Sequence, residues 1–343
     1  MQNNHNAHPH IIGSTCLDSA AEQGSHRVQY DIAVRSLCSP TGQGRRENQD
    51  NYLIIDGQGC ARFLSSELEH CIQASNWPAN HQRVAVLDGM GGHTHGREAA
   101  EQLVEGVLNI PATCDLNTLN EALSALHQKL HEQFHSMGLD SGCTMVLLEI
   151  PPADSPALLF HVGDSRLYAI DKQKVRYLTI DHVPATHMAI LGLIDKSKWT
   201  RQVHERPGSQ LSQAFILGTT MNTSHPFKGV ITPELFELKG DNIPPFLQGL
   251  DDRRLITLDA DTLYLLASDG LWNLRYPQRF ISRWSELLLQ PQRSLEELLD
   301  TLLAELAKTI QQQRSQPDDN CTAVLIRKSV STTQPAAPNK NPD

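Results

Sequence analysis

The chain has 343 residues, 39% of them hydrophobic, a formal net charge of −10 and a pI near 5.9. This length suits one large domain or two ordinary ones, and the acidic balance argues against a nucleic-acid partner. No apolar run approaches the roughly 20 residues that a helix needs to span a bilayer, so we expect no membrane insertion.

The first 26 residues are rich in Asn, His, Ser and Gln and lack the apolar core of a signal peptide. We expect a flexible arm over 1–26, in which His5, His8 and His10 belong to a solvated tail rather than to a weak metal site. The seven cysteines are scattered and show no C-x-x-C spacing, which is typical of reduced thiols in the cytoplasm. These features predict a cytoplasmic protein.

Apolar runs and alternating patterns predict a series of short strands. The predicted strands cover 30–37, 52–55, 84–87, 144–150, 157–162, 167–170, 175–179, 255–258, 262–267 and 322–326. The four strands between 144 and 179 are joined by turns rich in Pro, Asp, Gly and Lys, which predicts an antiparallel meander.

Helical periodicity is confined to four stretches, 97–109, 117–136, 277–289 and 294–313. Ser294 and Glu297 form a capping box at the start of the last helix. The connection 57–82 shows no clear pattern, and periodicity also dissolves over 181–242, where a long loop predicts a functional lid or a mobile segment. The Thr-, Pro- and Asn-rich tail 331–343 is expected to be disordered.

An acidic side chain ends one of the most apolar strands. Asp88 follows the run Val84–Leu87, and Gly89 comes next, so a carboxylate stands at the end of a core strand beside backbone without a Cβ atom. A buried carboxylate is costly unless it is paired or bound to a cation. The position of Asp88 therefore requires an explanation.

Four more aspartates stand at strand ends: Asp50, Asp164, Asp269 and Asp319. Taken singly, each reads as an ordinary turn residue. Taken together, the ends of strands buried on both faces converge, and crowded carboxylates repel one another unless a cation neutralises them. Oxygen ligands without a His or Cys cluster suit Mg²⁺ or Mn²⁺ rather than Zn²⁺. Two such ions bridged by one aspartate would lower the pKa of water and supply hydroxide near neutral pH.

Arg45 is the natural counterpart of these acids. Its guanidinium fork matches a pair of phosphate oxygens, and it stands shortly before Asp50 in the chain. The alternative is a surface ion pair with Glu47, which spacing alone leaves open.

In order along the chain, seven blocks of residues resemble those of the metal-dependent (type 2C, PPM) serine/threonine protein phosphatases, in the bacterial form with Met-Gly-Gly. The blocks are Arg45…Asn48-Gln49-Asp50, Asp88-Gly89-Met90-Gly91-Gly92-His93, Ser141-Gly142-Cys143-Thr144, Gly163-Asp164-Ser165-Arg166, Leu178-Thr179-x-Asp181-His182, Ser268-Asp269-Gly270-Leu271-Trp272 and Asp319-Asn320. The resemblance spans roughly 28–327. It implies an α+β fold, a four-layer α-β-β-α sandwich with two central antiparallel sheets flanked by helices, in which 27–330 form the catalytic domain.

The resemblance also implies a set of site residues. By position, the metal ligands are Asp88, the backbone carbonyl of Gly89, Asp269, Asp319, Asp50 and Asp164. Asp88 would bridge two Mn²⁺ or Mg²⁺ ions, Asp269 and Asp319 would hold the first ion, and Asp50 its water shell. Asp164 with Asp269 resembles a third, weaker site. Asp88, Asp269, Asp319 and Asp50 are the catalytic set, and Arg45 would bind the substrate phosphate.

The chain departs from the family pattern in several places. Gln49 stands where many eukaryotic members carry a metal-binding Glu, and Met90 takes the place of the His proposed there as general acid. His93 could replace that His as the proton donor, but a role in supporting the site or in starting the next helix is favoured. The run Leu211–Gly218 lacks the Arg usual in the family's flap, which leaves the substrate preference open.

The resulting hypothesis is a protein phosphatase that hydrolyses phosphoserine and phosphothreonine with metal-activated water and opposes a serine/threonine kinase. The main rival is a catalytically silent member of the fold that binds phosphoproteins as a regulator. A third possibility is an enzyme of the same fold that acts on a small phosphorylated molecule. The presence of every expected aspartate favours the enzyme.

Overall fold

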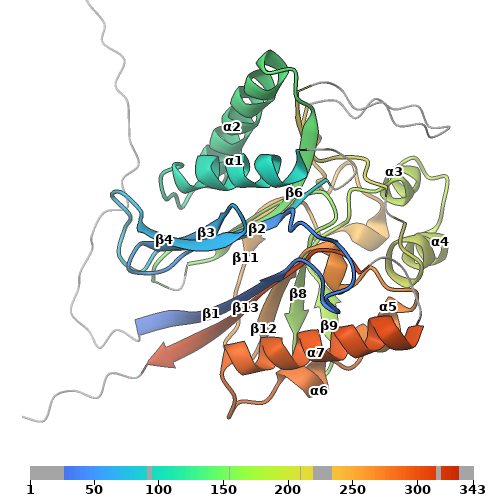
Figure 1. Cartoon of the computed structure of the whole chain (residues 1–343). Helices are drawn as coiled ribbons and strands as arrows, with labels where there is room; N and C mark the ends of the chain where they lie inside the picture. The colour runs from blue at the N-terminus through green and yellow to red at the C-terminus, as the bar shows by residue number, and fades with distance from the viewer. Residues whose placement is uncertain are drawn as a thin grey trace, which may run out of the picture.

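Two antiparallel β-sheets form the centre of the molecule (Figure 1). The structure, a computed structural model, describes residues 27–90, 95–153, 155–208, 210–218, 234–313 and 318–331. The first sheet contains, in spatial order, β1 (Arg27–Leu37), β13 (Cys321–Ser331), β12 (Leu263–Ala267), β8 (Arg166–Ile170) and β9 (Val175–Tyr177). The second sheet contains β11 (Arg253–Ile256), β7 (Ala157–Val162), β6 (Ser141–Ile150), β5 (Gln82–Gly89), β2 (Asp50–Ile55), β3 (Cys60–Ser65) and β4 (Leu68–Gln73), with β10 (Phe215–Leu217) paired to β6.

Helices cover the outer face of each sheet (Figure 1). The second sheet packs against α1 (Gly96–Leu108) and α2 (Leu116–Ser136), and the first against α5 (Pro277–Ile281), α6 (Trp284–Leu288) and α7 (Leu295–Gln313). A third apolar cluster joins the inner faces of the two sheets. This arrangement confirms the predicted α+β fold with four layers, α-β-β-α.

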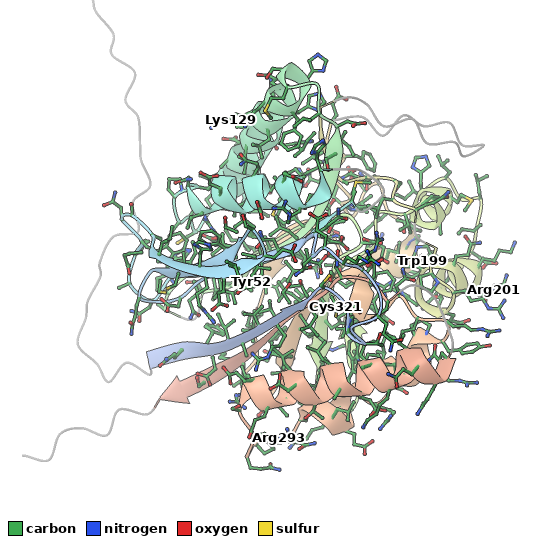
Figure 2. All side chains as sticks on the ribbon, viewed as in Figure 1. Tyr52, Lys129, Trp199, Arg201, Arg293 and Cys321 are labelled. Carbon is green, nitrogen blue, oxygen red and sulfur yellow. The ribbon has the colours of Figure 1, made fainter. Side chains whose placement is uncertain are left out.

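Both faces of the central strands are buried, as their continuous apolar runs predicted. In β5, Val84 and Val86 face the other sheet, whereas Ala85 and Leu87 face the helices. Tyr52 of β2 lies between the sheets (Figure 2). This alternation decides which way a side chain at the strand end points.

Three elements differ from the sequence prediction. The connection 57–82 contains the β3–β4 hairpin, whose second strand is exposed along its whole length and so lacks apolar alternation. Its turn uses positive φ angles at Ser66 (51°) and Glu67 (62°), where Asn or Gly is the usual signal. The expected helix 277–289 is two helices, α5 and α6. The expected meander divides after β7, because β7 and β8 belong to different sheets.

The stretch 181–242 also has more order than its sequence predicted. It contains α3 (Pro184–Ile190), α4 (Lys196–Thr200), the π-helical turn η1 (Arg201–Glu205) and β10, and the turn η2 (Pro245–Leu247) follows. These turns enclose a small apolar cluster that includes Ile180, Trp199 and Val203. The predicted arm 1–26, the tail after 331 and His93 lie outside the described residues. No helix in the described part of the chain is long and apolar enough to cross a bilayer.

Candidate functional site

Strand alternation directs two predicted acids into the layer between the sheets. Asp88 continues the face of Val84 and Val86 on β5, and it is the register partner of Asp50 on β2. Both carboxylates are therefore placed at one end of the inter-sheet layer. A direct hydrogen bond crosses that layer, because the hydroxyl of Ser268, next to β12, donates to Asp50 Oδ2 at 2.6 Å.

The other three acids reach the same place from turns. Asp269 opens the short turn η3 (Asp269–Leu271) directly after β12, and Asp319 stands just before β13. Asp164 lies in the turn that carries the chain from β7 to β8. The structure thus brings together all five aspartates that the sequence singled out.

The charges of these carboxylates repel one another. Burial raises the pKa of Asp88 well above its usual range, and Asp50, Asp269, Asp164 and Asp319 raise it further. Burial likewise raises the pKa of Asp50 to about 7 and that of Asp269 to about 6. It raises the pKa of Asp164 well above its ordinary value, with Asp269 adding to the effect. The protein therefore holds a concentration of negative charge that its own cations do not neutralise.

Arg45 forms an ion pair with one of these carboxylates. Its Nε and Nη2 donate to the two carboxylate oxygens of Asp319 at 2.8 and 3.3 Å, and the charges of Asp269 and Asp88 also act on it. The alternative pairing with Glu47 is not formed, since Glu47 Oε1 accepts from Arg97 Nε at 2.9 Å. With 39% of its side chain exposed, Arg45 is accessible to a ligand.

The loop that carries Arg45 is anchored by Asp318, a residue without a predicted role. The Asp318 carboxylate accepts hydrogen bonds from the hydroxyls of Ser39 and Thr41, and its carbonyl oxygen accepts from Arg45 N at 3.1 Å. Gly44 sits against the same backbone, because a Cβ atom there would lie 1.8 Å from the Asp318 carbonyl oxygen. Asp318 therefore fixes Arg45 beside Asp319.

Close backbone contact explains why glycine follows Asp88. A Cβ atom on Gly89 would lie 2.2 Å from the carbonyl oxygen of Gly96 and 2.6 Å from that of Gln49. The Gly89 N–H donates to the same Gln49 oxygen at 3.1 Å. Only glycine allows these three segments to meet at the site.

Asn320 is a second positioning residue that the sequence analysis left without a role. Its Oδ1 accepts from Gln49 N at 3.0 Å, and its Nδ2 donates to the carbonyls of Glu47 and Cys38 at 2.8 and 2.9 Å. It thus ties the segment between Arg45 and Asp50 to β13. One indication of this role was present in the sequence, because Asn320 follows Asp319 in the last of the seven blocks that resemble the phosphatase family.

Arg166 joins the site to the stretch 181–242. Its guanidinium is fully buried, donates to both oxygens of Asp181 at 2.6–3.1 Å and to the carbonyl of Val203 at 2.8 Å. It also lies 3.3 Å from the ring centroid of Trp272, in the block that begins at Ser268. Arg166 therefore positions the turns of Asp164 and Asp269 relative to one another.

The donor set fits a hard divalent cation. All the converging side chains offer oxygen, and the buried Oδ1 of Asp50 has no hydrogen-bond partner among the described residues. Within those residues, no three His, Cys, Asp or Glu side chains already gather closely enough to hold an ion. Asp319 is turned to Arg45, and Asp50 to Ser268. The chemistry of the cluster supports a cation, while its ligand geometry stays a prediction.

Comparisons with known proteins give a family match and several similar sequences. Residues 52–187 match the family model described as protein phosphatase 2C. The chain is 26% identical over 247 residues to protein phosphatase PhpP of Streptococcus pneumoniae, and this alignment covers 70% of this chain and 79% of that protein. It is also 26% identical over 259 residues to the serine/threonine phosphatase stp of Listeria monocytogenes, with 73% and 86% covered.

Solved structures share the fold. A serine/threonine phosphatase from Staphylococcus aureus aligns with a TM-score of 0.58 at 18% identity, covering 91% of this chain and 99% of that one. The catalytic domain of the phosphatase PstP, solved with two manganese ions, aligns with a TM-score of 0.53 at 21% identity, covering 88% and 99%. The chain thus matches the protein phosphatase 2C family model over residues 52–187 and is similar in sequence and in fold to bacterial serine/threonine phosphatases.

Proposed function

We propose that this phosphatase is Mn²⁺- or Mg²⁺-dependent and hydrolyses phosphoserine and phosphothreonine in proteins. The observation that carries the proposal is the convergence of five buried or half-buried aspartates, whose charges repel, beside one accessible arginine. A cation site explains why a folded protein retains such a cluster.

The proposed roles follow the positions of the residues. Asp88, the Gly89 carbonyl, Asp269, Asp319 and Asp50 would hold two ions, and Asp164 with Asp269 a weaker third one. Divalent cations held there would polarise the phosphate and activate water for its hydrolysis. Ser268 keeps the Asp50 carboxylate directed into the site through its 2.6 Å hydrogen bond.

Arg45 would bind the phosphate of the substrate. Its guanidinium already makes a paired contact with a carboxylate, and a phosphate offers the same two-oxygen geometry. Binding a phosphate would require Arg45 to release or share Asp319, which would free that carboxylate for a cation.

Replacing Arg45 by Ala is expected to raise KM for a phosphopeptide by about 10- to 100-fold, because a charged hydrogen-bonded contact contributes roughly 1.5–3 kcal/mol. Arg35→Ala is the matched control. Arg35 has 34% of its side chain exposed and pairs with Asp300 through the same two nitrogens, at 2.8 and 3.2 Å. Steady-state kinetics with Mn²⁺ measure both. An unchanged KM in the Arg45 variant would remove Arg45 from the phosphate site.

A panel of phosphoserine and phosphothreonine peptides is expected to release phosphate in the presence of Mn²⁺. Chelation with EDTA should stop the release, and added Mn²⁺ should restore it. Peptide binding without phosphate release would favour the silent regulator instead. Turnover restricted to small phosphate esters would favour a small-molecule substrate, and full turnover in EDTA would contradict metal dependence.

The proposal extends to the partners of the enzyme. The substrate class requires a serine/threonine kinase that places the phosphate on the protein. The scattered cysteines, which form no disulfide among the described residues, support a cytoplasmic location. The net charge of −10 supports the absence of a nucleic-acid partner.

A further inference from the structure

The β3–β4 hairpin lies at the edge of the second sheet (Figure 1). Each of its strands carries one cysteine, Cys60 on β3 and Cys71 on β4. In the strand register Cys60 pairs with Gln73, and Arg62 pairs with Cys71. Side chains alternate along a strand, so Cys60 and Cys71 point to the same face as diagonal neighbours. The two side chains lie close enough to interact, because Cys71 is the largest influence on the pKa of Cys60 and raises it to about 11. Cys71 is exposed and Cys60 partly exposed, so reagents in solution can reach the pair.

A cation stands next to these thiols. Arg62 is the direct cross-strand partner of Cys71 and projects from the same face of the hairpin. Its charge lowers the pKa of Cys60 and so opposes the rise that Cys71 and burial cause there. A neighbouring guanidinium favours the thiolate, which is the reactive form of cysteine. Cys143 and Cys321 are fully buried, so reagents in solution do not reach them, and burial raises the pKa of each thiol well above its usual range.

The Cα–Cα distance between diagonal neighbours is compatible with a disulfide that forms and breaks reversibly. Diagonal Cα atoms in an antiparallel pair lie about 7–8 Å apart, near the upper limit for a disulfide of roughly 7 Å. Closing the bond therefore requires a small shift of the exposed strand β4. Strained and exposed disulfides are the ones that thiols reduce easily.

We propose that Cys60 and Cys71 form a reversible dithiol–disulfide couple that a peroxide oxidises. The Cys71 thiolate attacks the peroxide; an S–O bond forms, the O–O bond breaks, and the departing hydroxide takes up a proton to become water. The Cys60 sulfur then attacks the sulfenic acid on Cys71. An S–S bond forms, the S–O bond breaks, and a second water leaves with the Cys60 proton. The two thiols lose two electrons in total, and the peroxide gains them.

This couple is independent of the proposed phosphatase chemistry. The tip of the hairpin contacts the site, since Glu67 Oε2 accepts from Asn48 N at 3.2 Å, but the cysteines stand toward the opposite, open end. Oxidation at Cys60 and Cys71 therefore leaves the converging aspartates in place.

The test uses the full chain, reduced and then treated with hydrogen peroxide, followed by alkylation and non-reducing peptide mass spectrometry. The expected product is one intramolecular Cys60–Cys71 linkage that a thiol reductant reverses. Arg62→Gln should slow its formation severalfold, and in Cys60→Ser the sulfenic acid on Cys71 should be trapped by a dimedone reagent. Cys114→Ser, which removes another exposed thiol, should form the linkage at the wild-type rate.

Three outcomes would overturn the proposal. One is oxidation of Cys71 while Cys60 stays fully alkylated in the wild-type chain. Another is a disulfide from Cys71 to a second copy of the chain in place of Cys60. The third is oxidation of the pair no faster than that of Cys114. Thermal unfolding of each variant checks that the hairpin remains folded.

Discussion

Replacing Asp88 or Asp269 by Asn is expected to lower kcat/KM by at least about 10³-fold, because bound ions stabilise the transition state of hydrolysis by several kcal/mol.

The same substitutions are expected to stabilise the metal-free protein. Asp88 is half-buried beside four other carboxylates, and the neutral amide removes its share of their mutual repulsion. At a pH high enough to ionise these acids, the melting temperature should rise by a few degrees, since one kcal/mol corresponds to roughly 2–4 °C.

Thermal unfolding with and without Mn²⁺ separates this explanation from simple damage to the fold. A cation that binds only the folded chain raises the melting temperature by mass action, and each variant should lose that rise. Asp31→Asn is the control, because Asp31 is 44% exposed and its charge faces Arg327 at 3.7 Å, away from the site. A variant that keeps wild-type turnover, or that keeps the Mn²⁺-dependent rise, would show that its carboxylate does not hold a metal ion.

The convergence of Asp88 and Asp50 was predictable because strand alternation and burial determine it. Asp88 and Asp50 continue strands that are apolar on both faces, so their carboxylates had to end in the core or at its edge. The contacts that fix the cluster were not predictable from spacing. The pairing of Arg45 with Asp319 joins residues far apart in the chain, and the choice between Asp319 and Glu47 depends on the loop that Asp318 anchors.

The parts of the fold that were missed have few apolar residues per element. Strand β4 is exposed at every position, so no alternation marks it. The helices between 181 and 242 are short and share one small cluster, so each buries too few residues to establish a helical period. Tertiary contacts, rather than local pattern, order these segments.

Arg166→Met is expected to destabilise the protein by about 3–5 kcal/mol, because it leaves the carboxylate of Asp181 buried without its partner. Asp181 is 2% exposed, and burial raises its pKa while the Arg166 charge and hydrogen bonds lower it. The loss corresponds to roughly 6–20 °C in melting temperature. Arg166→Lys keeps the charge but loses the two-pronged contact and the stacking on Trp272, so its stability should fall between the two.

A double variant tests whether the unpaired charge is the cause. Arg166→Met combined with Asp181→Leu removes both charges, and it should recover much of the stability lost by Arg166→Met alone. Arg176→Met is the surface control. Arg176 has 41% of its side chain exposed and faces Asp171 at 3.5 Å, so its loss should cost less than about 1 kcal/mol. If the double variant were as unstable as Arg166→Met, the penalty would come from lost packing against Trp272 and Val203. In that case Arg166 would position the Asp164 and Asp269 turns through contact rather than through its charge.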